Sequence, residues 1–262
     1  MLSLDFSGRV VAVTGGARGL GRTITETFLA AGSDVLVCGR HEPATDDLPR
    51  ATGPDGRERT AVFVVADIRE PDQAKAMVDA VVDRFGRLDV LVNNAGGSPS
   101  VPSADVSPRL VAGVVTLNLL APFYCSQAAN AVMQAQPDGG AIVNIGSVSG
   151  VRPSPFSAAY GAAKAGLINL TTSLAVEWAP KVRVNCVTAG LLDTGAGDDH
   201  YGGPEGFARV AGTIPLGRMG TPADIAAACL YLASPLAAFA TGTNLLVHGG
   251  GEWPAFLAAA RG

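Results

Sequence analysis

Tyr160 and Lys164 are the two side chains whose types and spacing suggest chemistry most directly. A helix places residues i and i+4 on one face, so this phenol and this ammonium would be neighbours. The attraction between a cation and an ionised phenol about 4 Å away, at an effective dielectric constant of about 20, is roughly 4 kcal/mol. That energy is about three pKa units, enough to bring a phenol that normally titrates near ~10 close to neutrality. The pair therefore predicts a proton donor, although the same spacing also arises by chance on surface helices.

A glycine-rich turn near the start of the chain suggests an anion-binding site. Residues 9–14 form a β-branched apolar run and residues 22–32 an amphipathic stretch, which predicts a strand before the turn and a helix after it. Gly15, Gly19 and Gly21 would let a pyrophosphate approach the helix N-terminus, where free N–H groups and the dipole favour anions. A plain tight turn is the alternative, and the flanking strand and helix make it the weaker one.

These features, together with two other motifs, resemble the short-chain dehydrogenase/reductase family. The motifs are Thr14–Gly21, Asn93–Gly96, Ser147, Tyr160 and Lys164. The resemblance covers nearly the whole chain and points to the short single-domain branch, with 3-oxoacyl reductase-like members. It implies one doubly wound α/β Rossmann-fold domain over residues 1–262, with a seven-stranded parallel sheet in the order 3-2-1-4-5-6-7 flanked by helices.

The alternation of apolar patterns along the chain agrees with that architecture. Strands are predicted at residues 9–14, 34–38, 61–66, 89–92, 141–146, 182–187 and 244–247, and helices at 20–31, 71–85, 105–135, 157–178 and 222–233. Such alternation builds a parallel sheet covered on both faces, and ligands bind at the carboxyl ends of its strands. Pro235 and Gly242 interrupt the uncharged segment 225–247, so it is interpreted as helix, turn and strand, not as a membrane span.

Composition and charge exclude several classes of protein. A chain of 262 residues, 48% hydrophobic and 16% charged, suits one large α/β domain, and its net charge of −4 argues against binding to nucleic acid. The first residues show no signal-peptide pattern. The cysteines have no metal-binding spacing, so we expect no metal site, reduced thiols and a cytoplasmic location. They are Cys38, Cys125, Cys186 and Cys229.

The family resemblance implies a role for each of four side chains. Tyr160 donates a proton to a carbonyl oxygen or accepts one from an alcohol. Lys164 lowers the pKa of that phenol and binds the nicotinamide ribose. Ser147, after the strand at 141–146, hydrogen-bonds the substrate oxygen. Asn118 holds a water that relays protons to Lys164; from the residues alone, it can also be a helix-interior asparagine that bonds a backbone carbonyl.

The residues after the second predicted strand favour NADP(H). An acid there would bond the ribose hydroxyls of NAD, but the strand is followed by Gly39 and Arg40. Arg40 offers a planar fork for a 2′-phosphate, and Arg18 can approach the same phosphate. Similar NADP-dependent family members carry basic residues at both places. The alternative is NAD(H), with Arg40 solvated and Arg18 in a local cap.

Further cofactor contacts follow from the resemblance. Asp67 would touch the adenine ring or, alternatively, cap the next helix, and Thr194 would contact the nicotinamide amide. Ala189 stands where the family usually has proline, which leaves the course of the next loop open, and His248 has no assigned role. The residues expected to bind cofactor are Gly15, Arg18, Gly19, Leu20, Gly21, Arg40, Asp67, Ile68, Asn94, Ala95, Gly96, Tyr160, Lys164, Gly190 and Thr194.

The substrate is less well determined than the cofactor. Residues 191–215 are expected to form a mobile substrate lid. Arg152 would meet a phosphate or carboxylate, or be solvated. The residues expected to line the substrate site are partly apolar and partly polar. Such a site fits a ketone on a lipid-like molecule, such as a 3-oxoacyl thioester or a steroid, and it also fits a polyol or sugar. The residues expected to contact substrate are Ser147, Val148, Tyr160 and Leu191.

The predicted function is hydride transfer between NADP(H) and a ketone or secondary alcohol. The alternatives are an NAD-dependent dehydrogenase of a polyol or sugar, a non-catalytic dinucleotide-binding sensor, and an epimerase or dehydratase. The intact set of four catalytic residues argues against the sensor. Similar proteins assemble through helices near the Tyr160 helix, so a homotetramer is expected, with a homodimer as the alternative. No nucleic-acid or membrane partner is expected.

Overall fold

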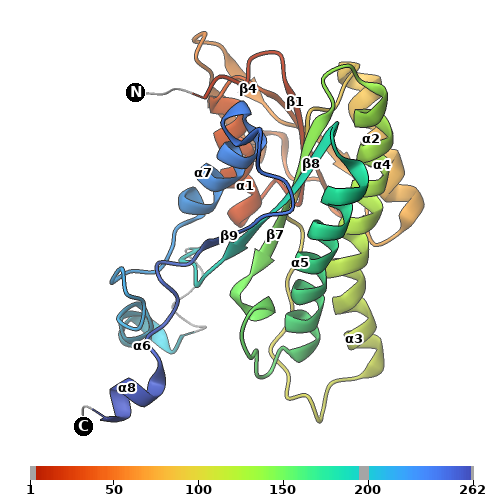
Figure 1. Ribbon diagram of the computed structural model, residues 1–262. Helices are drawn as coiled ribbons and strands as arrows, with labels where there is room; N and C mark the ends of the chain where they lie inside the picture. The colour runs from red at the N-terminus through yellow and green to blue at the C-terminus, as the bar shows by residue number, and fades with distance from the viewer. Residues whose placement is uncertain (1–3, 195–200, 261–262) are drawn as a thin grey trace.

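The computed structural model describes residues 4–194 and 201–260, which are built on one seven-stranded sheet (Figure 1). Neighbouring strands run parallel in the order β5-β2-β1-β6-β7-β8-β9. The strands are β1 (Val10–Thr14), β2 (Asp34–Gly39), β5 (Val62–Val65), β6 (Val90–Asn93), β7 (Gly140–Ser147), β8 (Val182–Ala189) and β9 (Asn244–Val247). Because β5 is the third of these strands along the chain, the predicted order 3-2-1-4-5-6-7 is confirmed.

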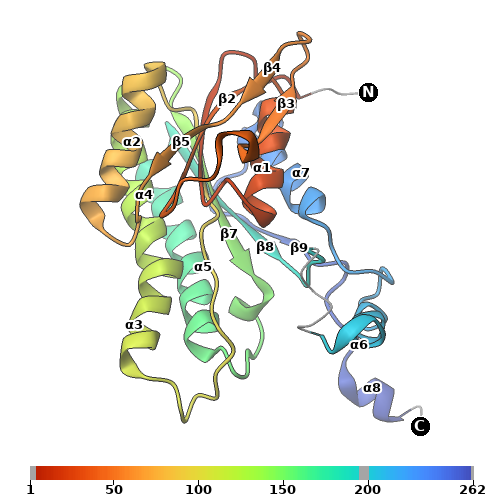
Figure 2. The ribbon, with the colours of Figure 1, turned by 180° about the vertical axis from the view of Figure 1, so that it is seen from behind.

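Helices cover both faces of the sheet (Figures 1 and 2). The helices α1 and α7 lie on one side, and α2, α4 and α5 lie on the other. The described helices are α1 (Gly19–Ala30), α2 (Pro71–Phe85), α3 (Pro108–Val115), α4 (Ala121–Ala135), α5 (Ala158–Trp178), α6 (Gly203–Ala211), α7 (Pro222–Ala233) and α8 (Ala255–Ala260). Short turns are η1 (Thr45–Asp47), η2 (Thr116–Leu120), η3 (Val148–Gly150) and η4 (Pro235–Ala237).

The strands supply side chains to both layers because successive residues point to opposite faces. In β1, Val11 and Val13 pack with α1 and α7, whereas Val10 and Ala12 pack with α2 and α4. All four are at most 3% exposed. Burial on both faces explains why the strands read as continuous apolar runs in the sequence and not as alternating ones.

The helix predicted at 105–135 is divided and begins later than expected. It starts at Pro108, after Ser107 accepts a hydrogen bond from the Leu110 N–H at 3.2 Å, which is the usual role of an N-cap serine. A π-helical turn, η2, then separates α3 from α4. Pro122 explains this turn, because it has no N–H to donate to the carbonyl four residues earlier, which is that of Asn118.

The run of residues 108–135 is long and apolar enough to cross a membrane by length and composition alone. In the structure, however, α4 packs its apolar side against β6, β7 and α2. We therefore interpret it as one of the helices that cover the sheet. Segment 225–247 forms most of α7, then η4 and β9, as predicted.

A β-hairpin between β2 and β5 was not predicted. Its strands β3 (Arg50–Thr52) and β4 (Glu58–Thr60) pair antiparallel and lie beside α1 (Figure 2). The turn between them is closed by Arg59, whose guanidinium holds Asp55 through two hydrogen bonds. An isolated two-stranded hairpin is marginal in water, so packing on α1 stabilises it. The sequence signal for this turn is the Pro-Asp-Gly tripeptide at 54–56.

The expected lid at 191–215 contains one helix in its described part. The helix α6 occupies residues 203–211, and residues 195–200 of the expected lid lie outside the described residues. With α8, α6 lies beyond the sheet, near the C-terminus of the chain (Figures 1 and 2).

Candidate active site

The glycine turn between β1 and α1 is held against the end of β6. Asn94 Nδ2 donates to the Thr14 carbonyl at 2.9 Å and to the Gly15 carbonyl at 3.3 Å. The backbone N–H groups of Asn94 and Ala95 both donate to Thr14 Oγ1 at 3.0 Å. A Cβ at Gly21 would lie 2.2 Å from the Gly15 carbonyl oxygen, so only glycine permits this approach.

The N-terminus of α1 is open to an anion. Its N-cap residue, Arg18, makes no side-chain cap hydrogen bond, and the first helical turn contains no acidic residue. Gly19 is exposed and Leu20 is half-buried at this end. The first N–H groups of a helix have no partner within it, and the helix dipole adds positive potential there. The turn therefore fits the pyrophosphate of a dinucleotide.

Two arginines beside this turn make no ion pair with the residues that the structure describes. Arg40 follows β2 and Arg18 precedes α1, and both are exposed. Asp67 feels the charge of Arg40, but hydrogen bonds from Arg69 are the main reason that its carboxyl pKa lies below the ordinary value. Because Arg69 already matches the charge of Asp67, Arg40 remains available to a phosphate.

Asp67 does not cap the helix that follows it, so that alternative is wrong. The helix α2 begins at Pro71 with Glu70 as its N-cap residue. Asp67 lies three residues before that cap, and its Oδ1 accepts a hydrogen bond from the Arg69 N–H at 3.2 Å instead. Ile68 is buried behind it.

Ser147, Tyr160 and Lys164 meet where β7 ends and α5 begins. Ser147 is the last residue of β7, and its hydroxyl accepts a hydrogen bond from the Ser149 N–H at 3.2 Å. Tyr160 and Lys164 lie in the first two turns of α5, and Lys164 Nζ is 5.6 Å from the centre of the Tyr160 ring. The predicted neighbourhood of phenol and ammonium on one helix is confirmed by this distance.

The turn η3 packs directly on α5 and so fixes Ser147 relative to Tyr160. A Cβ at Gly150 would lie 2.8 Å from the Ala165 nitrogen, and a Cβ at Gly161 would lie 2.8 Å from the Ser149 carbonyl oxygen. Two glycines, one on each side, therefore allow backbone to touch backbone. The sequence carries both glycines, but nothing in their spacing of eleven residues indicated this contact.

Lys164 is buried and charged near neutral pH. Its side chain is 3% exposed, and Nζ donates to the Ile145 carbonyl at 2.7 Å. Burial lowers its pKa to about 8. Burial also raises the pKa of the Tyr160 phenol, and only the Ser147 hydroxyl opposes that shift.

The expectation that the phenol pKa falls below its ordinary value is therefore wrong for this structure. The ammonium is directed to the backbone of β7, and removal of the phenol from water is the larger effect.

Asn118 lies in η2, buried, and is bonded to the loop after β6. Its Nδ2 donates to the Gly97 and Val114 carbonyls, both at 2.9 Å, and its Oδ1 accepts from the Gly97 N–H at 3.0 Å. The bond to a helix carbonyl matches the simpler of the two interpretations of this asparagine. A Cβ at Gly96 would lie 2.7 Å from Asn118 Oδ1 and 3.3 Å from Lys164 Nζ, so all three residues converge.

The ends of β8 and β9 form the remaining side of the site. Ala189 pairs with Ser147 on one side and Val247 on the other, so β8 continues through the position where proline was expected. The Gly190 N–H then donates to the Val247 carbonyl at 2.9 Å. Thr194 is exposed and is the last described residue before 195–200. A small hollow here is lined by Val148, Gly190, Leu191, Ile214, His248, Gly251 and Glu252.

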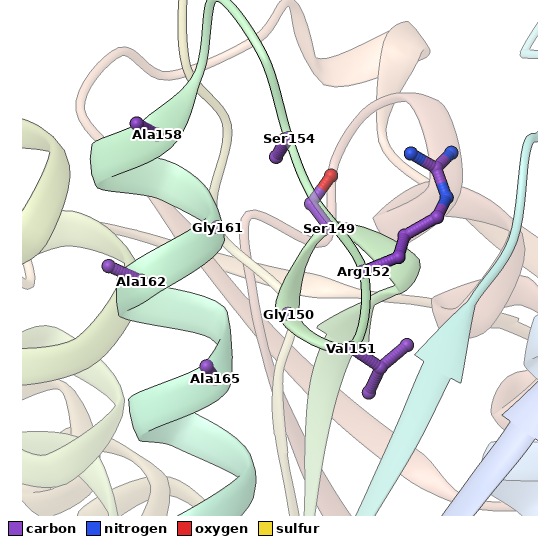
Figure 3. A pocket seen from close by; sticks show the side chains of 9 residues that line it. All are labelled: Ser149, Gly150, Val151, Arg152, Ser154, Ala158, Gly161, Ala162 and Ala165. Atoms are coloured by element: carbon purple, nitrogen blue, oxygen red, sulfur yellow. The ribbon is translucent and has the colours of Figure 1, made fainter.

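A larger cavity of about 410 Å³ is lined by Ser149, Gly150, Val151, Arg152 and Ser154 and by residues of α5 (Figure 3). From α5 it takes Ala158, Gly161, Ala162 and Ala165, which share one helical face. Tyr160 is two residues from Ala158 and from Ala162 and points away from them, whereas Lys164 is three residues after Gly161 and adjoins this face. Arg152 also lines this cavity, whereas Tyr160 and Lys164 do not.

Comparison with known proteins agrees with this geometry. The family model described as enoyl-(acyl carrier protein) reductase matches residues 15–252. The chain is 36% identical to 3beta-hydroxysteroid dehydrogenase 1 of Eggerthella lenta, over 94% of each protein. It is 35% identical to an L-rhamnose 1-dehydrogenase (NAD(P)(+)) of Azotobacter vinelandii, over 95% of this chain and 98% of that protein.

A solved structure agrees as well. Aldohexose dehydrogenase of Thermoplasma acidophilum superposes with a TM-score of 0.83 at 32% identity, covering 93% of this chain and 94% of that one. The relatives named above are dehydrogenases, and their matches extend over nearly the whole chain. The protein belongs to the short-chain dehydrogenase/reductase family and is an NAD(P)-dependent oxidoreductase of alcohol or ketone substrates.

Proposed function

We propose that the protein transfers a hydride between NADP(H) and a ketone or secondary alcohol on a lipid-like molecule, with Tyr160 as the proton donor. The observation that carries this proposal is the meeting of Ser147, Tyr160 and buried Lys164 at the ends of β6 and β7. That meeting point lies at the same edge of the sheet as the anion-binding turn after β1.

Each side chain has a distinct task in this proposal. The Ser147 hydroxyl donates a hydrogen bond to the substrate carbonyl oxygen, and Tyr160 passes its proton to that oxygen. The bound cofactor supplies the hydride to the carbonyl carbon. Lys164, protonated below its pKa of about 8, stabilises the tyrosinate left behind and binds the ribose. Asn118 fixes the loop at Gly97 and holds a water that returns a proton through Lys164.

Turnover is the direct test of this function. The purified protein is assayed for NADPH oxidation with oxoacyl thioesters, steroid ketones, aldoses and diketones. We expect Tyr160→Phe to reduce kcat at least about 10²-fold, because general acid catalysis contributes about that much. Tyr231→Phe is the matched control, since Tyr231 lies on α7 and is 41% exposed. Equal turnover by the Tyr160→Phe variant would overturn the assignment.

The NADP preference rests on Arg18 and Arg40. Both are exposed beside the turn, and the Asp67 carboxylate, which feels the charge of Arg40, is bound by Arg69. A guanidinium is suited to the 2′-phosphate, which NAD lacks. The remaining cofactor contacts are assigned to Gly15, Gly19, Leu20, Gly21, Ile68, Asn94, Ala95, Gly96, Gly190 and Thr194.

Cofactor preference is tested with Arg40→Ala. We expect the ratio of kcat/KM for NADPH over NADH to fall by about tenfold or more, because one charge-assisted contact to the phosphate is lost. Arg50→Ala is the control, since Arg50 is an exposed arginine of the neighbouring hairpin whose guanidinium bonds the Asp46 carbonyl. An unchanged ratio in Arg40→Ala contradicts the proposed phosphate contact.

Two groups of relatives suggest two substrate classes. The steroid dehydrogenase supports a lipid-like ketone at Val148 and Leu191, which are apolar. The rhamnose and aldohexose dehydrogenases support a sugar or polyol as the second candidate. The substrates of the turnover assay distinguish these two classes. A sensor without catalytic activity would bind NADPH and turn over substrates of neither class.

We further propose that the chain forms a single catalytic domain, which includes a lid at 191–215. We expect the protein to work as a homotetramer in the cytoplasm. The four cysteines are free and buried, which suits a reducing compartment. A homodimer is the alternative assembly, and sedimentation distinguishes the two.

A further inference from the structure

An ion pair joins the turn after Ser147 to the segment after β9. Arg152 Nη2 donates to Glu252 Oε1 at 2.6 Å, although the two residues are 100 positions apart in the chain. The other terminal nitrogen, Nη1, donates to the Pro153 carbonyl at 3.3 Å. Glu252 is thus held through one nitrogen and not through the two-nitrogen fork that a guanidinium can offer a carboxylate.

Each partner of this ion pair lines a hollow beside the proposed active site, Glu252 the smaller one and Arg152 the larger one. The Arg152 N–H donates to the Val148 carbonyl at 3.0 Å, which ties its backbone to the residue after Ser147. Glu252 lines the same small hollow as Val148 and Leu191. Because β7, β8 and β9 are neighbours in the sheet, the pair bridges the carboxyl ends of its last strands.

Arg152 also faces the lid region. Its side chain extends away from α5 (Figure 3). Burial raises the pKa of the Tyr201 phenol, two residues before α6, and the positive charge of Arg152 opposes that shift. Arg152 therefore bonds the segment after β9, and its charge also acts on Tyr201.

We propose that Glu252 sets the charge preference of the substrate site by neutralising Arg152. With Glu252 in place, an anionic substrate meets a guanidinium that is already paired and a carboxylate that repels it. Without that carboxylate, Arg152 presents its fork to a substrate carboxylate or phosphate. The two side chains are 38% and 27% exposed, so the pair can be altered without opening the core. The inference rests on the proposed function, which places the substrate at Ser147 and Tyr160.

Binding of two matched ketones tests this proposal without any turnover. The protein, saturated with NADP⁺, is titrated by calorimetry with levulinate and with methyl levulinate, which differ by one negative charge. We expect Glu252→Gln to bind levulinate about tenfold more tightly than the unaltered protein, the factor of one charge-assisted hydrogen bond. Binding of the ester should not change. Combining Arg152→Gln with Glu252→Gln should abolish the gain.

The control is Glu26→Gln, which removes the carboxylate from another partly exposed Arg–Glu pair, on α1. Glu252→Ser replaces the glutamine variant if that variant fails to fold. The proposal is overturned if levulinate binding changes less than about twofold, if it is not measurable in either Glu252 variant, or if the gain persists without Arg152. Absence of turnover with every ketone would instead defeat the proposed function, and it would leave this comparison of binding intact.

Discussion

The ammonium of Lys164 is buried, and removing a positive charge from water destabilises the folded protein. The side chain is buried against β7, with the Ile145 carbonyl 2.7 Å from Nζ, and its pKa is lowered from 10.5 to about 8. At pH 7 the amine is still protonated, so the folded protein bears a desolvation cost that the unfolded chain does not. The unfolded chain binds this proton more tightly, and the free energy of unfolding therefore rises with pH between about 8 and 10.5.

We predict that Lys164→Met stabilises the protein at pH 7 while removing most of its activity. The gain should be about 1–3 kcal/mol, since each pKa unit is worth about 1.4 kcal/mol and the lost hydrogen bond offsets part of it. At pH 10 the gain should fall by more than half, because the native amine is then neutral. Urea unfolding at both pH values measures it.

Lys75→Met is the control for that measurement. Lys75 is 68% exposed and pairs with Asp79 on the surface of α2. Its replacement should change stability by less than about 0.5 kcal/mol at either pH. A Lys164→Met protein less stable than the original at pH 7 would show that the buried ammonium is held by more favourable contacts than we infer.

At the scale of elements, the contact between η3 and α5 sets the position of Ser147 relative to Tyr160, the two proposed catalytic groups. Ser147 belongs to a strand and Tyr160 to a helix, and η3 is the short connection whose backbone touches that helix. Effective alignment of reacting groups is sensitive to displacements of about 1 Å. The packing of these two elements should therefore affect the rate more than it affects the fold.

We predict that Gly150→Ala lowers kcat at least about tenfold, because misplacement by about 1 Å is known to cost more than that. The new methyl group would lie 2.8 Å from the backbone of Lys164 and Ala165, so η3 must move away from α5. The loss of stability should be about 1–3 kcal/mol. Turnover and urea unfolding are measured together.

Gly113→Ala provides the comparison, because a Cβ on this glycine of α3 would meet nothing within 4 Å. It should leave kcat unchanged and stabilise the helix by up to about 1 kcal/mol. Equal kcat in Gly150→Ala and the original protein would mean that η3 does not position Ser147.

For the molecule as a whole, two separate surfaces expose large apolar side chains. On α5, Val176 is 82% exposed. On the consecutive elements α7, η4 and β9, the exposed residues include Leu236, at 55%, and Leu246, at 46%. A tetramer with D2 symmetry needs more than one kind of twofold interface, and exposed apolar surfaces of this sort often mark interfaces.

We predict that the protein sediments as four copies of the 26.5 kDa chain. Val176→Glu and Leu246→Glu should each give a dimer, because each variant places charges opposite each other at one interface. The two substitutions together should give a monomer. Arg109→Glu, at an exposed position of α3, is the control for added negative charge. Sedimentation of the original protein as a monomer would refute the assembly.

The sequence by itself located the strands and the candidate chemistry-bearing residues, and the resemblance to a known family supplied the sheet order. Two of the patterns are local: the glycine spacing at 15–21 and the i, i+4 pair of Tyr160 and Lys164. A local pattern can be recognised in the sequence because it depends on one helix or turn only. Apolar runs located all seven strands of the sheet to within a few residues. The hairpin at 50–60 and the break in the helix at 116–120 were missed, since both depend on single turn or proline residues within longer stretches.

Only the tertiary structure decided how these groups behave. The sequence placed Lys164 beside Tyr160, but packing directed the ammonium to Ile145 and buried the phenol, so that its pKa rises instead of falling. The pairing of Arg152 with Glu252 is likewise invisible in a chain where 100 residues separate them. The exposure of a side chain to water and its contacts with distant residues arise only when the helices pack on the sheet. The pKa of a buried group depends on these two factors more than on its neighbours along one helix.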